Sequence, residues 1–351
     1  MICPVFLPHL GCTKRCTYCH QTYITQIDGD DIKTTIKKML PKKGAEYEVG
    51  LYGGNIFGIE PGFLKKIFAS FEEYKDKILN FRISTKPVPL NDEIISILKE
   101  NNVTVIELGI PSFNNRILQK INRGHTSNDL IMAYNRLRSE GFYVALQVMV
   151  GLPDETEQDI MDMVEHILML KPDYIRIYPL AIIIGTPLWQ DYENGSFVPI
   201  SFEEAVLRAL YIYLEASINR IKVVKMGLTD NEVIKEKIVG GFYHPAFGNI
   251  VKSEGFFLAM LTKLEDEKIK GHIKIYVHKR DIPHIIGYKR SNMERLKNQG
   301  IIIEIEERQV NQGNFVIDCK DKEFNCHISY ALKGLYKKGF VAKLPETYDL
   351  R

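Results

Sequence analysis

The feature that most constrains this chain is a run of three cysteines near its N-terminus. Cys12, Cys16 and Cys19 follow an apolar stretch, residues 2–10, in a C-x3-C-x2-C arrangement. Half of the six cysteines thus lie within eight residues, a clustering that chance rarely produces. Three thiolates at this spacing can hold three corners of a four-iron, four-sulfur (4Fe–4S) cluster and leave one iron open to a small molecule.

A structural zinc site is the alternative that these cysteines leave open. It needs four closed ligands, and the candidates for the fourth are His9, His20, Cys319 and Cys326. No second Cys-x2-Cys pair accompanies the run, so the spacing favours a cluster. Cys319 and Cys326 are interpreted as small core residues, with an auxiliary metal site as the alternative.

The composition excludes a disordered chain and argues against a membrane protein. The chain has 351 residues, of which 45% are hydrophobic, enough for one large domain and a small one. No apolar run reaches about 18 residues and no secretory signal pattern precedes the cysteines, so we expect a cytoplasmic protein without a membrane partner. Clustered cysteines also fit reduced thiols better than a disulfide framework.

Short apolar runs alternate with helical patterns over the first half of the chain. We predict strands at residues 2–10, 46–52, 79–84, 103–108, 143–150 and 174–178. We predict helices at residues 32–40, 63–74, 92–100, 114–121, 127–140 and 155–170. This order indicates an α/β fold with a parallel sheet, either open or curved into a partial (β/α)6 barrel.

Polar, glycine and proline residues recur at or near the ends of the predicted strands. They are Gly53, Gly54, Ser84, Lys86, Glu107, Gln147 and Pro179, and the cysteine run follows the first strand. Ligands bind at the carboxyl ends of parallel strands, so these residues predict one shared site. The alternatives are a plain turn at the glycines, a surface lysine, and a structural hydrogen-bond network around Glu107 and Gln147.

The cysteine run, with Tyr18 before its third cysteine, resembles the hallmark motif of the radical S-adenosylmethionine (SAM) superfamily. The resemblance implies that Cys12, Cys16 and Cys19 bind a 4Fe–4S cluster and that SAM binds the open iron. One electron would then split the SAM sulfonium, and the resulting 5′-deoxyadenosyl radical would abstract hydrogen from the substrate. It also implies an electron donor such as ferredoxin or flavodoxin.

The same resemblance implies which residues contact SAM. They are Tyr18, Gly53, Gly54, Ser84, Lys86, Glu107 and Gln147. The chain departs from the family pattern at three positions. Asn55 replaces an acid or threonine, Lys86 replaces an arginine that would bind the SAM carboxylate as a fork, and Pro111 replaces a glutamine expected near the ribose. Gln147 is therefore the better candidate for the ribose.

Later stretches narrow the resemblance to one branch of the superfamily. Residues 176–188 and 241–248 look like the branch of the Elongator catalytic subunit and its short bacterial relatives, and more distantly like oxygen-independent coproporphyrinogen oxidases. The resemblance covers about residues 3–255. The acetyltransferase domain of Elongator has no counterpart of sufficient length, so we expect no acetyl transfer. His244, before Pro245, is interpreted as a turn residue, with a contact to substrate as the alternative.

The C-terminal part carries the positive charge of the chain. From Gly271 onward there are 15 Lys and Arg against 10 Asp and Glu, although the whole chain has a net charge of only +2. This bias points to a polyanionic partner, with a solvated basic face as the alternative. We predict strands at 273–278, 301–306 and 315–319 and helices at 282–286, 291–298 and 324–338.

The predicted order βααββα, with a Gly-x-x-Arg loop between the first two helices, resembles a small α+β domain of the type I KH family. That resemblance implies RNA binding through Lys274, Gly287, Tyr288, Lys289 and Arg290. Arg290 stands where the family has a second glycine, which disfavours close backbone approach but adds a guanidinium for phosphate. The alternative is a packing module that binds no RNA.

Together these patterns predict four regions: a radical SAM core (1–190), its C-terminal extension (191–262), a charged linker (263–270) and a KH-like domain (271–345). The function that they favour is modification of a base in tRNA or rRNA by radical SAM chemistry. One alternative is a radical SAM enzyme acting on a small molecule or peptide. Another is a non-enzymatic iron–sulfur RNA-binding protein. The sequence leaves the oligomeric state open.

Overall fold

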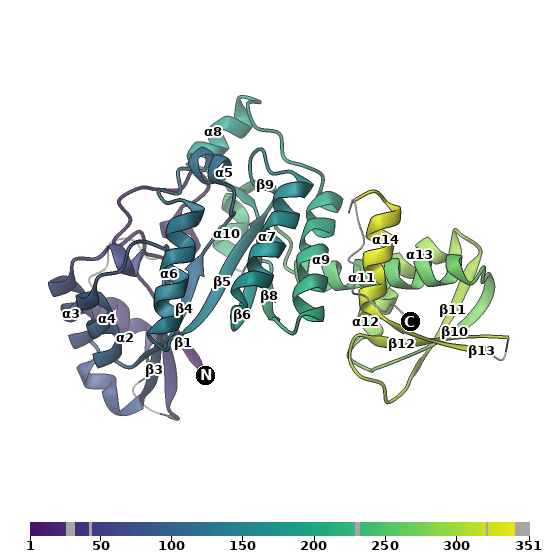
Figure 1. Cartoon of the computed structure of the whole chain (residues 1–351), viewed down its shortest axis with the longest axis horizontal. Coiled ribbons are helices and arrows are strands. Elements are labelled where there is room, and N and C mark those ends of the chain that lie inside the picture. Colours follow the sequence, from purple (N-terminus) through teal and green to yellow (C-terminus); the bar gives the residue numbers. More distant parts are fainter. Residues whose placement is uncertain (26–31, 42–43, 229–231, 321, 341–351) are drawn as a thin grey trace. The chain divides into compact units, whose positions relative to one another are not determined.

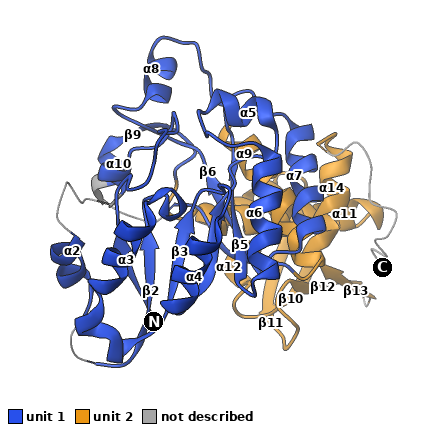
Figure 2. Ribbon diagram, turned by 60° about the vertical axis from the view of Figure 1, so that its left-hand side comes forward, with its two compact units in different colours: residues 1–199, 221–243 blue, residues 200–220, 244–351 orange. Residues whose placement is uncertain are grey.

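The structure is a computed structural model that describes residues 1–25, 32–41, 44–228, 232–320 and 322–340 (Figure 1). The chain divides into two compact units (Figure 2). The first comprises Met1–Pro199 and Ile221–Tyr243, and the second comprises Ile200–Arg220 and His244–Arg351. The predicted fold class is confirmed, because the first unit is a parallel α/β half barrel and the second contains a small mixed sheet.

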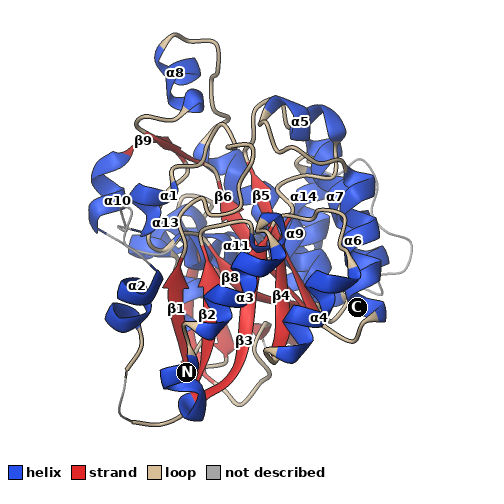
Figure 3. Ribbon diagram, turned by 90° about the vertical axis from the view of Figure 1, so that its left-hand side faces the viewer, coloured by secondary structure: helices blue, strands red, loops and turns tan. Residues whose placement is uncertain are grey.

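A seven-stranded parallel sheet with the order β1-β2-β3-β4-β5-β6-β8 forms the first unit (Figure 3). Its strands are β1 (Ile2–Phe6), β2 (Tyr47–Tyr52), β3 (Ile78–Thr85), β4 (Val103–Gly109), β5 (Tyr143–Val150), β6 (Tyr174–Pro179) and β8 (Lys222–Met226). Strands β1 and β8 are the two edges of this sheet. The sheet therefore stays open on one side, as expected for a half barrel.

Helices follow most strands of this unit and pack against the sheet, for example α4 against β4 and α6 against β5. They are α1 (Gln21–Thr25), α2 (Ile32–Met39), α3 (Pro61–Ala69), α4 (Asp92–Glu100), α5 (Asn115–Lys120), α6 (Ser127–Ser139), α7 (Glu157–Leu170), α8 (Pro187–Glu193) and α10 (Glu232–Lys237). Two short strands, β7 (Ala181–Ile183) and β9 (Ile238–Gly241), pair antiparallel. Among the described helices, none is long and apolar enough to cross a membrane.

Several elements of the first unit differ from the prediction. The strand expected at residues 2–10 ends at Phe6, because residues 8–10 form a turn in which His9 adopts a φ of 57°. The helix expected at 63–74 ends at Ala69, and a 3-10 helix (Glu72–Lys77) follows because the backbone of Phe71 leaves the helical region while its side chain enters the core. Strand β8 ends at Met226. Gly227 adopts a φ of 97°, which an extended strand cannot continue, and β8 adds a seventh strand to the six predicted.

The second unit combines helices with a four-stranded sheet of order β11-β10-β12-β13. Its elements are α9 (Phe202–Ile218), α11 (Phe247–Asp266), β10 (Gly271–Val277), α12 (Ile282–Ile286), α13 (Ser291–Lys297), β11 (Ile301–Glu307), β12 (Asn314–Cys319), β13 (Lys322–His327) and α14 (Ala331–Lys337). Helix α11 contacts α9, α12 and α14, so it forms the centre of this unit. A Cβ atom at Gly255 in α11 would lie 2.9 Å from Leu210, which shows how closely α9 approaches.

The predicted helix at 324–338 is wrong in its first part. Residues 322–327 form β13, which pairs antiparallel with β12, and the helix α14 begins only at Ala331. The residues of β13 alternate polar and apolar, a period that a neighbouring strand can stabilise. The observed order is βααβββα, so the KH-like order βααββα is not confirmed. Helix α11 continues to Asp266 and so includes the first residues of the predicted linker.

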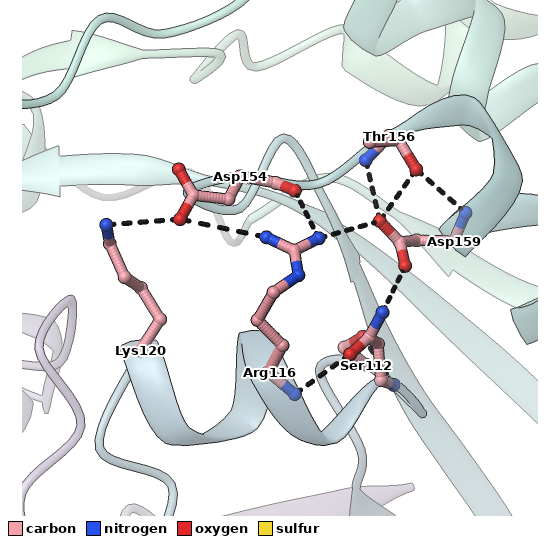
Figure 4. Close-up of polar contacts among 7 residues, drawn as sticks. Ser112, Arg116, Lys120, Asp154, Thr156 and Asp159 are labelled. Atoms are coloured by element: carbon pink, nitrogen blue, oxygen red, sulfur yellow. Dashed lines mark hydrogen bonds and ion pairs between the residues drawn. The ribbon is translucent and has the colours of Figure 1, made fainter.

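A polar network in the first unit joins the loop after β5 to α5 and α7 (Figure 4). Asp159 accepts hydrogen bonds from the backbone N–H and the hydroxyl of Thr156, both at 2.8 Å, and completes a capping box at the start of α7. Its other oxygen accepts from Asn114, and Arg116 lies 3.5 Å away. On the exposed side of the same network, Asp154 pairs with Lys120 at 3.1 Å.

Asp159→Asn is expected to lower the free energy of unfolding by about 1–3 kcal/mol, because the new amide group must face a donor of Thr156 or Asn114. Burial opposes the charge of Asp159, but its hydrogen bonds outweigh burial and lower its pKa. The charged form therefore stabilises the fold at neutral pH, and this stabilisation disappears as the pH falls below about 4. Urea unfolding at pH 7 and pH 3 measures both effects. Asp154→Asn is the matched control and should change stability by less than about 0.5 kcal/mol.

Candidate active site in the half barrel

A cavity of about 540 Å³ lies within the first unit. Its walls are side chains of one face of the strands, such as Phe6, Tyr52, Ser84, Gln147 and Arg176. Alternate residues such as Val5, Leu51, Ile83, Val148 and Ile177 point the other way and are fully buried. Because successive residues of a strand face opposite sides, one face of the sheet forms the core and the other forms the cavity.

The loop that carries the cysteines packs tightly against the Gly53-Gly54 turn at the end of β2. A Cβ atom at Gly54 would lie 2.7 Å from the carbonyl oxygen of Leu10 and 2.8 Å from that of Leu7, so only glycine fits there. Asn55 fixes the same contact, since its backbone N–H donates to Leu10 at 2.7 Å and its side-chain amide donates to Gly11 at 3.2 Å. Asn55 is thus a structural residue of the site.

All three cysteines line the cavity. Arg123 donates a hydrogen bond to the sulfur of Cys16 at 3.2 Å, and Gln21 donates to the sulfur of Cys19 at 3.1 Å. Burial raises the pKa of Cys12 and raises that of Cys19 to about 11. Burial also opposes ionisation of Cys16, but the charges of Arg123 and Lys86 outweigh it and lower the pKa of that thiol. The thiolate, which is the form that binds metals, is therefore favoured at Cys16.

Lys86 bridges the end of β3 and the cysteine loop. Its ammonium donates to the carbonyl oxygen of Lys14 at 2.9 Å and lies 3.4 Å from that of Arg123. Its backbone N–H donates to the side-chain oxygen of Asn55 at 3.2 Å, and the hydroxyl of Thr85 donates to the same oxygen at 2.9 Å. An ammonium has three donors, so Lys86 can hold the loop and still contact a ligand in the cavity.

The structure brings together nearly all the residues predicted for the site. The cavity is lined by Cys12, Cys16, Tyr18, Cys19, Gly53, Gly54, Ser84, Lys86 and Gln147. They come from β2, β3 and β5, at or near the carboxyl ends of these strands, and from the cysteine loop after β1, as the strand pattern predicted. The assignment of individual residues to the cluster and to SAM stays a prediction.

Glu107 is the exception, because it is fully buried beneath the cavity and is not among its lining residues. Its carboxylate accepts from Gln147 at 2.7 Å and from Tyr174 at 2.6 Å, and pairs with Arg176 at 2.8 Å and Arg82 at 3.5 Å. A direct contact to SAM is therefore not supported. Glu107 instead positions Gln147 and Arg176, as in the structural network that the sequence left open.

The cavity also has lining residues that the sequence analysis did not assign to it, among them Arg123, Arg176, Tyr178 and Lys225. Arg176 and Tyr178 alternate in β6 on the same face as Tyr174, so their strand period could have placed them in the barrel. No local signal marks Arg123, which follows α5 and reaches Cys16 only through the tertiary fold. Lys225 lies in β8, at the edge of the sheet.

The residues predicted to bind RNA lie in the second unit. Tyr288, Lys289 and Arg290 are exposed, and Gly287 is buried at the start of their loop. Lys274 forms ion pairs with Glu306 at 2.7 Å and with Glu304 at 3.8 Å, so these carboxylates balance its positive charge.

The structure also shows the surroundings of His244 and of the two cysteines of the second unit, Cys319 and Cys326. His244 accepts a hydrogen bond from the backbone of Ala246 at 3.0 Å, which fits a turn residue. Cys319 pairs with Lys322 and Cys326 with Phe315, at opposite ends of the β12–β13 hairpin. This separation argues against an auxiliary metal site formed by the two cysteines.

Glu107→Gln is expected to lower the free energy of unfolding by about 3 kcal/mol or more, because two arginines then lose a buried negative charge. Glu48→Gln is the matched control. Glu48 pairs with Arg82 at 2.7 Å but is 28% exposed, so its loss should cost about 1 kcal/mol. Guanidinium unfolding of both variants measures the difference, and equal losses would contradict the central role of Glu107.

Comparison with known proteins gives the family. The model of the radical SAM superfamily matches residues 6–167, and the model of the radical SAM C-terminal domain matches residues 172–255. Together they correspond to the region 3–255 in which the sequence resembled that superfamily. Neither match extends into the C-terminal sheet.

Individual relatives are distant. An uncharacterized protein of Methanocaldococcus jannaschii is 29% identical over 201 residues, which cover 55% of this chain and 60% of that protein. The tRNA uridine(34) acetyltransferase of the same organism is 29% identical over 152 residues, covering 42% of this chain and 28% of that enzyme. The chain thus spans less than two thirds of either relative.

Among solved structures, Elp3 of Methanocaldococcus infernus with an N-terminal deletion aligns with a TM-score of 0.54 at 18% identity, over 90% of this chain and 73% of that chain. This likeness shows a shared fold. The two family matches show that the chain belongs to the radical SAM superfamily and carries that superfamily's C-terminal domain.

Proposed function

We propose that this chain is a radical SAM enzyme that modifies a base in RNA, with Cys12, Cys16 and Cys19 as cluster ligands. The observation that carries the proposal is that the cysteine loop and the carboxyl ends of strands β2 to β6 surround one cavity. Membership in the superfamily implies a 4Fe–4S cluster and SAM as cofactors. A cavity of about 540 Å³ is within the usual range, roughly 300–1,000 Å³, for small-molecule ligands.

The donor set fits a cluster better than a single metal ion. Within the described residues, no three His, Cys, Asp or Glu side chains converge closely enough to hold one ion. In a 4Fe–4S cluster each cysteine binds a different iron atom, so the three sulfur atoms surround the cluster and need not converge on one ion. Arg123 and Lys86 lie beside the cysteines and supply positive charge that offsets thiolates. Three ligands also leave the fourth iron open.

The remaining lining residues would hold SAM. Gly53 and Gly54 line the cavity, where their backbone would contact SAM, and Lys86 offers a cation for the SAM carboxylate. Gln147, held by Glu107 at 2.7 Å, would contact the ribose. Bound together, the reduced cluster and SAM supply a carbon-centred radical that removes hydrogen from the substrate. The walls of the half barrel exclude water from that reaction, and an electron donor such as ferredoxin or flavodoxin would reduce the cluster.

The second unit supports RNA as the substrate. Lys279 and Arg280 precede α12, Lys289 and Arg290 follow it, and all four are exposed. Tyr288 is 43% exposed, and the Lys289 ammonium lies 5.6 Å from the centre of its ring. Exposed cations beside an aromatic face are the elements with which proteins bind single-stranded nucleic acid. A curated relative that acts on tRNA, the tRNA uridine(34) acetyltransferase, is consistent with this choice.

Alanine substitution of Cys12, Cys16 or Cys19 is expected to remove most of the iron from anaerobically reconstituted protein and to abolish cleavage of SAM to 5′-deoxyadenosine. Cys319→Ala is the control, because Cys319 lies in β12 of the second unit and should leave the iron content unchanged. Iron and sulfide analysis with chromatography of the nucleoside products measures both effects. Full iron content in any of the three variants, or zinc in place of iron in the wild type, would overturn the cluster assignment.

Removing two loop cations tests the RNA substrate. Lys289→Gln combined with Arg290→Gln should weaken binding of total tRNA and reduce the salt dependence of log K by about 1–2, because each cation contacts about one phosphate. Lys65→Gln combined with Lys66→Gln removes the same charge from the exposed surface of α3 and should leave binding unchanged.

Nucleoside mass spectrometry of RNA from cells with and without the gene then tests the reaction itself. A nucleoside that is lost with the gene supports the proposal. An unchanged nucleoside profile, with intact SAM cleavage by the purified protein, would favour a small molecule or peptide as the substrate.

A further inference from the structure

Arg123 is a buried cation that contacts one of the predicted cluster ligands. Its guanidinium donates hydrogen bonds to the sulfur of Cys16 at 3.2 Å, to the Nε2 atom of His125 at 3.2 Å and to the carbonyl oxygen of Gly109. Of these three acceptors, only the sulfur can carry a negative charge. Burial of a charge is costly unless an opposite charge lies beside it. The contact with Cys16 therefore favours a charged sulfur next to the guanidinium.

Two hydrogen bonds hold the loop that follows α5 against the cysteine loop. The side-chain amide of Asn122 donates to the carbonyl oxygen of Arg15 at 2.9 Å. The backbone N–H of Thr17 donates to the carbonyl oxygen of Ile121 at 3.0 Å. Residues 15 and 17 flank the cysteine that Arg123 contacts. Contacts within the protein thus direct the guanidinium at this sulfur, so the arrangement is preorganised for a cofactor.

A chain of hydrogen bonds fixes the other side of the guanidinium. The Nδ1 atom of His125 lies 3.1 Å from the carbonyl oxygen of Thr126, and its Nε2 atom accepts from Arg123. The tautomer that satisfies both contacts carries its proton on Nδ1. Thr126 is in turn the N-cap of α6, where its side chain and that of Asp129 form a capping box. The start of a regular helix thereby supports the orientation of Arg123.

A buried cation that donates to a ligand sulfur favours the reduced form of an iron–sulfur cluster. Reduction adds one negative charge, and hydrogen bonds to the sulfur atoms are among the factors that set the reduction potential. Burial strengthens the effect of the cation, because water screens it less. Gln21 also donates to a ligand, the sulfur of Cys19 at 3.1 Å, but its amide is neutral. A charged donor is about twice as strong as a neutral one, so Arg123 has the larger effect.

We propose that Arg123 raises the reduction potential of the cluster through its contact with Cys16, and so eases reduction by a one-electron donor of the ferredoxin or flavodoxin class. One electron passes from the reduced donor to the cluster, and the guanidinium stabilises the added negative charge without gaining or losing a proton. Arg123 is a positioning residue, because it acts through Cys16. This inference rests on the proposed function for the cluster at the three cysteines, but not for RNA as the substrate.

Arg123→Gln tests the proposal, because it keeps a hydrogen-bond donor and removes the charge. The measurement is the midpoint potential of the anaerobically reconstituted protein without SAM, from a redox titration followed by electron paramagnetic resonance. We expect a lower potential in Arg123→Gln than in the wild type. Arg123→Lys keeps the charge but loses the planar fork, so its decrease should be smaller. An unchanged potential in an Arg123→Gln protein with full iron content would overturn the proposal.

Arg15→Gln is the matched control, because it removes the same charge from the residue that precedes Cys16 in the sequence. Arg15 is exposed, so water and salt screen its charge, and the potential should fall by less than it does in Arg123→Gln. An equal decrease in the two variants would mean that the total charge of the loop sets the potential. That result would contradict a specific role of the buried contact.

A measurement on the wild-type protein tests the contact even if a variant binds no cluster. In protein labelled with nitrogen-15 arginine, electron–nuclear double resonance of the reduced cluster should detect a coupled guanidinium nitrogen, and absence of this coupling would overturn the proposal. A wild-type protein without iron would overturn the cluster assignment as well. An unchanged RNA nucleoside profile after gene deletion, with a potential that depends on Arg123, would overturn the RNA substrate and support this inference.

Discussion

The carboxylate of Glu107 is the interaction on which the interior of the half barrel depends. It is fully buried, and its partners Arg82, Gln147, Tyr174 and Arg176 come from β3, β5 and β6. Removing a charge from water costs several kcal/mol, so a carboxylate is tolerated there only because cations and donors surround it. The same contacts fix the side chains of Gln147 and Arg176 at the cavity wall, and thereby join the stability of the sheet to the shape of the site.

A second set of contacts governs the mouth of the cavity, where Asn55 and Lys86 tie the cysteine loop to the ends of β2 and β3. Backbone carbonyls of a loop are natural acceptors for an ammonium and an amide, so the loop gains a fixed conformation before any cofactor binds. The departures from the superfamily pattern at these positions have structural reasons here. Asn55 accepts from the Thr85 hydroxyl and the Lys86 backbone with one oxygen, which a threonine could not reproduce with the same reach.

Positive charge dominates the lining of the cavity. Cations of the cysteine loop lie beside the predicted cluster, and a separate pair lies on β6 and β8. Burial strengthens such electrostatic interactions relative to water. The described lining, which includes six Lys and Arg side chains, therefore favours anionic occupants.

The sequence by itself determined the elements whose signals are local. Helix α4 and strand β5 have the predicted bounds, because their apolar periodicity and flanking residues are contained in the segments themselves. The cysteine run and the strand-end residues also predicted the cavity. Tertiary structure decided the rest. Strand β13 exists because β12 pairs with a short alternating segment that its own residues would not hold extended. The burial of Glu107, the contact of Arg123 with Cys16 and the pairing of Arg176 with Lys225 join residues far apart in the chain, and only the register of the folded sheet and its loops brings them together.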